Sequence, residues 1–273
     1  MKKYGVTIYM KVYFKSKVGI RNTNEDKHTI ILNSNNQDPT KQQIDMFGIY
    51  DGHGGVSVSN ILSNIAPKLF LDKRIVYPLH KAYVTKLCSN IQSILSDDFT
   101  EKTRECGSTC LMIFKIKYLG NDILNIVNIG DSRAVICHGF IGIPLTVDHK
   151  PLNPIEKQRI TKQGGTVYYD GLEWRVDNLS LSRAFGDTNS KYTYPQPDLF
   201  NHKITSDDKF IIMACDGLWD VMDNQTAVNF VLHFCYGENE KRINEKINIA
   251  DKLAEYAISQ GSTDNVSVIV IFF

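Results

Sequence analysis

The stretch Met46-Phe47-Gly48-Ile49-Tyr50-Asp51-Gly52-His53-Gly54-Gly55 runs from an apolar segment directly into an acid and a group of glycines. A short apolar run that stops at such a turn is typical of a buried strand. The strand would deliver Asp51 to the point where the backbone turns. The segment 210–215 repeats this order, because its apolar residues stop at Asp216-Gly217.

Two further acids stand at similar strand edges, since Asp131 follows Gly130 and Asp264 precedes the last apolar run. Any one of these acids has an ordinary explanation, because Asp-Gly is a common hairpin dipeptide and Asp caps helices. Carboxylates gathered within about 4 Å repel by roughly 4 kcal/mol per pair at an effective dielectric near 20. Divalent cations offset this repulsion most directly, so the pattern favours a metal centre.

The candidate ligands indicate which metal would bind. All of them are oxygen donors, and no Cys/His pair has zinc-finger spacing. Hard oxygen ligands favour Mg²⁺ or Mn²⁺ over Zn²⁺. Two such ions about 3.5–4 Å apart would activate a bridging water and clamp an in-line displacement at phosphorus.

Apolar periodicity predicts strands in consecutive groups and helices in separate groups. The expected strands are 6–14, 46–50, 109–116, 123–128, 134–137, 209–215 and 266–273. The expected helices are 58–71, 81–95, 154–163, 225–234 (after a capping Asp223) and 244–259. Because βαβ alternation is absent, a sandwich of antiparallel sheets flanked by helices fits better than a doubly wound fold. Residues 33–43 are expected to form a surface loop, and no segment resembles a linker between domains.

The bulk composition is that of an ordinary globular protein, with 273 residues, 42% hydrophobic and 22% charged. A net charge of +1 gives no field that would attract nucleic acid or a membrane, and no stretch is apolar enough to span a bilayer. The six cysteines show no close paired spacing, which favours a reduced compartment. We expect a monomer in the cytoplasm, with the nucleus left open as a second location.

Nine motifs follow one another over residues 21–273. They are Arg21 to Asp26 (RNTNED), Phe47 to Gly55 (FGIYDGHGG), Gly107-Ser108-Thr109, Asn128 to Val135 (NIGDSRAV), Leu145 to Pro151 (LTVDHKP), Arg159-Ile160 with Gly164-Gly165, Leu181 to Asp187 (LSRAFGD), Ala214 to Met222 (ACDGLWDVM) and Gly261 to Val266 (GSTDNV). In this order they resemble the metal-dependent protein phosphatases of the PPM or PP2C family. The resemblance implies an α+β fold in four layers, an α-β-β-α sandwich whose two mainly antiparallel sheets are flanked by helices. It also implies one catalytic domain over residues 1–273, with a flap subdomain at about 150–200.

The resemblance further implies which residues hold two Mg²⁺ or Mn²⁺ ions. By motif position, Asp51 would bridge both ions. Asp216 and Asp264 would complete the first ion, while Glu25 and the carbonyl of Gly52 would hold the second. No metal-ligand position is missing, which argues against a catalytically dead relative.

Other roles follow from the same resemblance. Asp26 would be a hydrogen-bonding partner beside the ligands, and Arg21 would grip the substrate phosphate with its planar fork. His53 would donate a proton to the leaving alkoxide. In some members of the family a third, weaker ion uses the acids matching Asp131 and Asp220.

Several residues depart from the family pattern or have a structural interpretation. Asn178 stands where the family usually has glycine, and residues 188–196 are idiosyncratic, so substrate choice cannot be carried over. Asp148-His149 is interpreted as structural support rather than as a catalytic dyad. Trp174 and Trp219 are expected to pack in the flap or core rather than to bind a ligand.

These features predict a protein serine/threonine phosphatase that hydrolyses phosphoserine and phosphothreonine with a water or hydroxide bridging two divalent ions. A cysteine-nucleophile phosphatase would need Cys, five residues and then Arg, which none of the six cysteines has. The intact acids disfavour a silent phosphoprotein-binding module. A third alternative is a metal-dependent hydrolase of nucleic acid or of small phosphoesters, and the lack of a basic patch with interleaved aromatics disfavours nucleic acid. The expected partners are phosphoprotein substrates, with neither nucleic acid nor a membrane.

Overall fold

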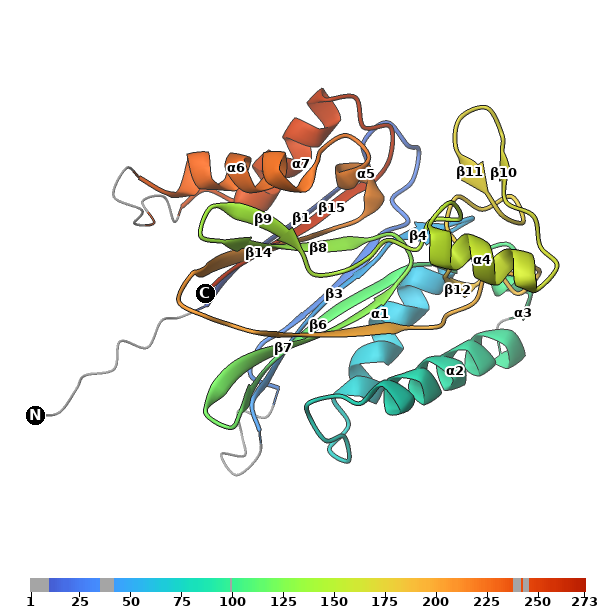
Figure 1. Ribbon diagram of the computed structural model, residues 1–273, viewed down its shortest axis with the longest axis horizontal. Helices are drawn as coiled ribbons and strands as arrows, with labels where there is room; N and C mark the ends of the chain where they lie inside the picture. The colour runs from blue at the N-terminus through green and yellow to red at the C-terminus, as the bar shows by residue number, and fades with distance from the viewer. Residues whose placement is uncertain (1–9, 35–41, 99, 238–241, 243–245) are drawn as a thin grey trace, which may run out of the picture.

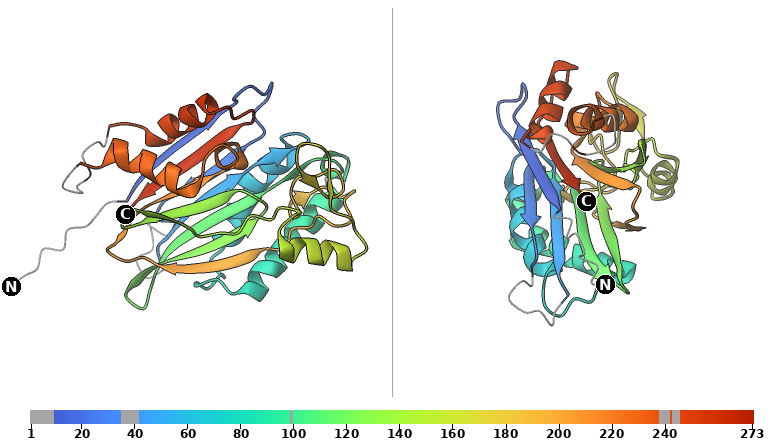
Figure 2. Two further views of the ribbon diagram at one scale, coloured as in Figure 1. Left: turned by 45° about the horizontal axis from the view of Figure 1, so that its top comes forward. Right: turned by 90° about the vertical axis from the view of Figure 1, so that its left-hand side faces the viewer.

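The computed structural model describes residues 10–34, 42–98, 100–237, 242 and 246–273. They form four layers, in which two five-stranded sheets lie face to face with helices on the outer faces (Figures 1 and 2). The described pairs of strands within these sheets are antiparallel. The structure therefore confirms the predicted α-β-β-α sandwich.

Each sheet combines strands from distant parts of the chain. The first has the order β1 (Lys11–Lys17), β15 (Val266–Phe272), β14 (Asp208–Ala214), β8 (Arg133–His138) and β9 (Ile141–Pro144). The second has the order β13 (Asp198–Lys203), β7 (Asn121–Ile129), β6 (Cys110–Tyr118), β3 (Ile44–Tyr50) and β2 (Lys27–Ile31). Short strands form two smaller sheets, namely β12 (Phe185–Gly186) with β5 (Gly107–Ser108) and β4 (Gly52–His53), and β10 (Tyr168–Tyr169) with β11 (Trp174–Arg175).

The helices divide between the two outer faces and one end. Helices α1 (Ser57–Phe70) and α2 (Lys81–Asp98) pack on the second sheet, and α6 (Asn224–Cys235) and α7 (Ile249–Ser259) pack on the first. The short helices are α3 (Thr100–Thr103) and α5 (Asp216–Trp219). Helix α4 (Pro154–Lys162) and the β10–β11 hairpin lie at one end of the sandwich, in the expected flap region (Figure 1).

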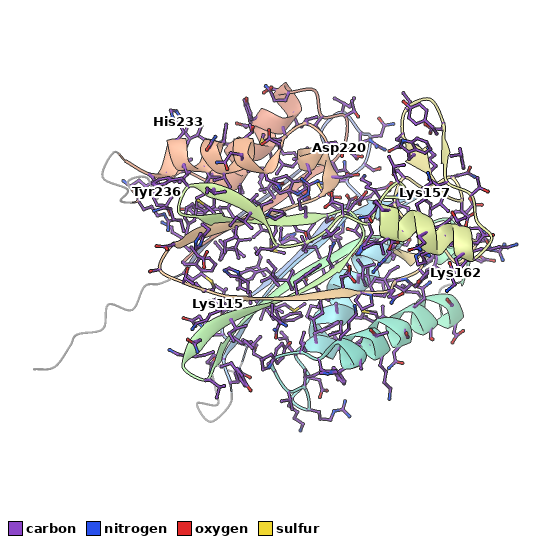
Figure 3. All side chains as sticks on the ribbon, in the orientation of Figure 1. Lys115, Lys157, Lys162, Asp220, His233 and Tyr236 are labelled. Atoms are coloured by element: carbon purple, nitrogen blue, oxygen red, sulfur yellow. The ribbon has the colours of Figure 1, made fainter. Side chains whose placement is uncertain are left out.

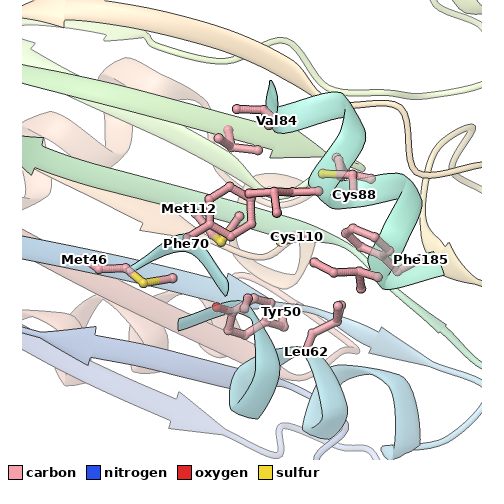
Figure 4. Packing of buried hydrophobic residues seen from close by; sticks show 14 of the residues in the cluster. Met46, Tyr50, Leu62, Phe70, Val84, Cys88, Cys110, Met112 and Phe185 are labelled. Atoms are coloured by element: carbon pink, nitrogen blue, oxygen red, sulfur yellow. The ribbon is translucent and has the colours of Figure 1, made fainter. Parts of the chain in front are cut away.

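Strand β3 shows why the central strands are continuously apolar. Successive side chains of a strand point to opposite faces of its sheet. Met46 and Tyr50 therefore pack toward α1 and α2, where Figure 4 shows them beside Phe70. Phe47 and Ile49 pack into the layer between the two sheets. Because both faces are covered, the strand is buried without interruption from Met46 to Tyr50, and it holds Asp51 rigidly at its end.

Some predicted bounds were wrong. Residues 6–9 of the expected strand 6–14 lie outside the described residues, and β1 starts at Lys11 and continues to Lys17. Both faces of β1 are packed, because Val12 contacts the core between the sheets while Tyr13 contacts the core under the helices. The helix expected from 244 begins instead at Ile249. Most of the loop expected at 33–43 also lies outside the described residues.

Among the described residues, no helix is both long enough and apolar enough to cross a membrane.

Candidate active site

Strand ends bring the predicted acids together at one end of the sandwich. Asp51 lies between β3 and β4, Asp131 follows β7, Asp216 follows β14 and Asp264 precedes β15. Oxygens of Asp51, Asp131 and Asp216 lie within 4.8 Å of one another. These four acids border one cavity of about 700 Å³, together with Arg21, Glu25, Gly52, His53 and Asp220. The predicted site residues thus lie on this cavity, apart from Asp26, which is buried beside it.

The acids interact strongly in this arrangement. Burial raises the pKa of Asp51 well above its usual range, and the charges of Asp216 and Asp26 raise it further. Burial and the charge of Asp131 do the same to the pKa of Asp216. Burial raises the pKa of Asp26 to about 6, and the charge of Asp264 adds to this effect. Proton uptake reduces the repulsion within a buried cluster of carboxylates, and a bound cation would reduce it in the same way.

The donor atoms fit a hard divalent cation. Both carboxylate oxygens of Asp26 are buried, as are those of Asp131, and apart from the Lys150 ammonium beside Asp131 they have no hydrogen-bonding partner among the described residues. Among the described residues, the sulfur that lies close to the cluster is Cys215 Sγ, within 4.8 Å of oxygens of Asp26 and Asp51. Burial raises the pKa of the Cys215 thiol well above its usual range, and Sγ accepts a 3.1 Å hydrogen bond from the Ser267 amide. The thiol therefore stays protonated, and oxygen ligands favour Mg²⁺ or Mn²⁺.

Glu25 is positioned by a short loop that packs against β4. Its amide donates to Asn265 Oδ1 at 2.8 Å, and Asn265 Nδ2 donates to the Thr23 carbonyl at 2.9 Å. The Glu25 side chain accepts a 3.0 Å hydrogen bond from the Gly55 amide. A Cβ at Gly52 would lie 2.5 Å from the Glu25 carbonyl oxygen and 2.8 Å from Ser59 Oγ. Glycine at this position therefore lets β4 lie close to the Glu25 loop.

Arg21 stands at the mouth of the cavity. Its Nη2 donates to Asp264 Oδ2 at 2.7 Å, and its Nε donates to the Thr263 carbonyl at 3.2 Å. The arginine side chain is 57% exposed, so it can meet a substrate that enters from solvent. An exposed guanidinium at the rim of an acidic cavity suits an anionic ligand.

His53 is held by Asp187, which the sequence analysis did not single out. His53 Nε2 lies 2.8 Å from Asp187 Oδ2. A Cβ at Gly107 would clash with both side chains, so glycine there makes room for the pair. Burial alone would lower the pKa of His53, but the hydrogen bond to Asp187 and the charges of Asp187 and Asp131 outweigh it and raise that pKa. The only signal in the sequence was the place of Asp187 at the end of the motif 181–187.

Lys150 was also missed, although it belongs to the motif 145–151. Its Nζ lies 2.5 Å from Asp131 Oδ2 and 3.6 Å from Asp216 Oδ2. Burial would lower the pKa of Lys150, but the charges of Asp131, Asp216 and Asp220 raise it above its usual range. The ammonium is therefore charged at neutral pH.

Residues interpreted as structural behave that way. Arg133 donates to Asp148 at 3.0 and 2.6 Å, while His149 Nδ1 accepts from the Gly130 amide at 3.0 Å. Trp219 is buried, and its Nε1 donates to the Ala214 carbonyl at 3.0 Å. The tryptophan and the Asp148-His149 pair thus support the turn before Asp131 and the start of α5.

Two residues of the segment 168–178 are also placed by the structure. Trp174 packs against Tyr169 in the flap hairpin, with ring centroids 5.6 Å apart. Asn178 has a φ of +69°, in the left-handed region that glycine adopts most easily. Asparagine tolerates this region better than most residues, which explains why it can replace glycine here.

Comparisons with known proteins agree with this geometry. Residues 10–266 match the family model described as protein phosphatase 2C. A protein of Acanthamoeba polyphaga mimivirus, "PP2C-like domain-containing protein R307", is 46% identical over 168 residues, which are 55% of this chain and 94% of that protein. The rice protein named "Probable protein phosphatase 2C 59" (Oryza sativa subsp. japonica) is 36% identical over 241 residues, which are 85% of this chain and 67% of that protein.

Solved structures share the fold. A Caenorhabditis elegans sex-determining protein superposes with a TM-score of 0.82 at 24% identity, over 96% of this chain and 64% of that longer one. A phosphatase from Toxoplasma gondii superposes with a TM-score of 0.78 at 24% identity, over 97% of this chain and 93% of that one. The family model, the relatives and the fold agree that this chain belongs to the protein phosphatase 2C family of metal-dependent serine/threonine protein phosphatases.

Proposed function

We propose that this phosphatase hydrolyses phosphoserine and phosphothreonine with two Mg²⁺ or Mn²⁺ ions. Asp51 would bind both ions, Asp216 and Asp264 would bind one, and Glu25 and the Gly52 carbonyl would bind the other. The convergence of carboxylate oxygens from separate strand ends on one cavity carries this proposal. When bound, the ions would lower the pKa of water and neutralise phosphate charge.

The remaining site residues have separate tasks in the proposal. Arg21 binds the phosphate at the rim of the cavity, which its exposure allows. Asp26 lies behind the ligands, where its buried carboxylate supports Asp51. His53 donates a proton to the leaving serine or threonine oxygen, oriented by its contact with Asp187. Asp131 and Asp220 border the same cavity and are the ligands proposed for a third ion.

The test is turnover of a phosphoserine peptide with and without metal. We expect activity with added Mg²⁺ or Mn²⁺ and none after exhaustive chelation, and Asp51→Asn should abolish turnover at saturating metal. Asp122→Asn is a matched control, because Asp122 pairs with Lys115 on the surface of β6 and β7 and does not border the cavity. Full activity of the chelated enzyme would refute the two-ion proposal.

The proposal also covers the state and the location of the enzyme. We propose that it acts as a monomer on phosphoproteins in the cytoplasm, and that the nucleus is a second location. Light scattering at working concentration tests the first statement, and fractionation of cells that express the protein tests the second.

A further inference from the structure

A lysine side chain from the segment that leads into α4 reaches two acids that border the acidic cavity. Lys150 Nζ lies 2.5 Å from Asp131 Oδ2 and 3.6 Å from Asp216 Oδ2. Lys150 also borders a neighbouring cavity together with Asp220. Lys150 therefore lies close to three acids of the site, namely Asp131, Asp216 and Asp220.

Asp131 depends on this contact more than its neighbours do. Its side chain is only 1% exposed, and apart from the Lys150 ammonium its carboxylate has no hydrogen-bonding partner among the described residues. A buried carboxylate is costly unless a cation is close to it. Within the described residues, the ion pairs of Asp131 are with Lys150 alone.

The backbone holds the lysine next to Asp131. The amide of His149 donates to the Gly130 carbonyl at 3.0 Å, so the residue before Lys150 is bonded to the residue before Asp131. On the other side, the amide of Asn153 donates to the Lys150 carbonyl at 3.0 Å. The backbone therefore keeps the Lys150 ammonium close to Asp131. A free ion must compete with this attached ammonium, whose effective concentration at the site is high.

We propose that Lys150 is a built-in cation that fills the position at Asp131 and Asp220 where a third divalent ion would bind. The inference rests on the proposed two-ion centre and predicts that a third ion binds weakly in this chain. When a site is already filled most of the time, an incoming ion binds only the fraction of molecules in which the site is free. Its apparent affinity falls in proportion to that fraction. The native lysine therefore limits the centre to two tightly bound ions.

The experiment counts bound Mn²⁺ by equilibrium dialysis and isothermal titration calorimetry. We expect two tight ions in the wild type and three in Lys150→Met, with the third at least about tenfold tighter than any third ion in the wild type. Adding Asp131→Asn to Lys150→Met should return the count to two. Lys150→Arg keeps the charge and should bind as the wild type does.

A matched control is Lys115→Met. Lys115 also pairs with an aspartate, at 3.4 Å from Asp122 Oδ1, but it lies away from Asp220 (Figure 3). This variant should bind two ions as the wild type does. If Lys150→Met does not fold, Lys150→Gln, which removes the charge but keeps a donor, takes its place.

The outcomes separate the two ideas. No Mn²⁺ binding by the wild type would overturn the proposed function itself. Two ions in both the wild type and Lys150→Met, or three of equal affinity in both, would leave the two-ion centre standing and overturn the role of Lys150. An unchanged count with weaker binding of inorganic phosphate would also overturn it, because Lys150 would then be a phosphate ligand.

Discussion

The chemical role of His53 depends on its contact with Asp187. The 2.8 Å contact with Asp187 orients the imidazole, and Gly107 leaves the space that this pair needs. The His53 side chain is 26% exposed, so a substrate can reach it from the cavity. An oriented, accessible imidazole at the rim of a phosphate site is suited to give a proton to a leaving group.

If His53 is the general acid, its importance depends on the leaving group. A serine alkoxide is strongly basic, so His53→Gln should lower kcat on a phosphoserine peptide by about 10²–10⁴-fold. A nitrophenolate leaves without help, so the variant should lose much less on nitrophenyl phosphate. The measurement is the ratio of kcat for the two substrates at saturating metal. An equal loss on both would mean that His53 shapes the site and is no acid.

Among the helices and strands, a buried ionic network fixes α4 to the sandwich. Glu156 of α4 is buried and accepts hydrogen bonds from Arg183 at 2.5 Å, Arg159 at 2.9 Å and Ser182 Oγ at 2.8 Å. Arg183 also donates to Asp198 of β13 at 3.3 Å. One carboxylate thus connects α4 with the segment leading to β13.

We expect Glu156→Gln to loosen this attachment. Losing the carboxylate leaves two guanidinium groups with a weaker partner, so the free energy of unfolding at pH 7 should fall by on the order of 3 kcal/mol. Burial would raise the pKa of Glu156, but Arg183 and Arg159 outweigh it and lower the pKa to about 2. Because the folded value lies below the ordinary value of 4.5, this stabilisation is present above pH 4.5 and is lost as the pH falls toward 2.

Urea unfolding of both proteins between pH 7 and pH 2 measures this effect. The difference between the wild type and Glu156→Gln should be constant above about pH 5 and should shrink in more acidic solution. A difference that stays the same down to pH 2 would contradict the assignment of the ionised network to Glu156.

The sequence predicted the central elements better than the peripheral ones. Strand β14 is covered on both faces, so it is an unbroken apolar run that periodicity detects. Edge strands such as β13 and β9 carry mixed side chains and were missed, because pairing with a neighbour rather than local pattern makes them strands. The start of α6 was predicted from its cap Asp223, while the start of α7 was placed too early because the capping role of Asn248 was overlooked.

At the scale of the whole molecule, the positions of the acids were predictable, but their partners were not. Each acid ends or precedes a recognisable apolar run, and two stacked sheets bring those ends to one place. The partners Asp187 and Lys150 come from segments whose conformation depends on the packed flap. Their contacts are therefore tertiary, and no local sequence pattern predicts them.

The convergence of the acids lowers the stability of the metal-free protein. Burying these carboxylates close together costs free energy because they repel one another. Part of the stability of the fold offsets this cost. Bound ions should raise the stability of the folded protein instead, because a ligand that binds only the folded state stabilises it by mass action. The melting temperature of the whole protein therefore reports on the site.

We predict that Asp51→Asn and Asp216→Asn each raise the Tm of the metal-free protein, since each removes one repelling charge. At about 2–4 °C per kcal/mol, a few degrees are expected. Added Mg²⁺ or Mn²⁺ should raise the Tm of the wild type strongly and that of the two variants less. Asp122→Asn should keep the full metal-induced shift, because Asp122 pairs with Lys115 away from the cavity. Equal metal-induced shifts in all four proteins would mean that the ions bind elsewhere, because removing a ligand must weaken the stabilisation that its ion provides.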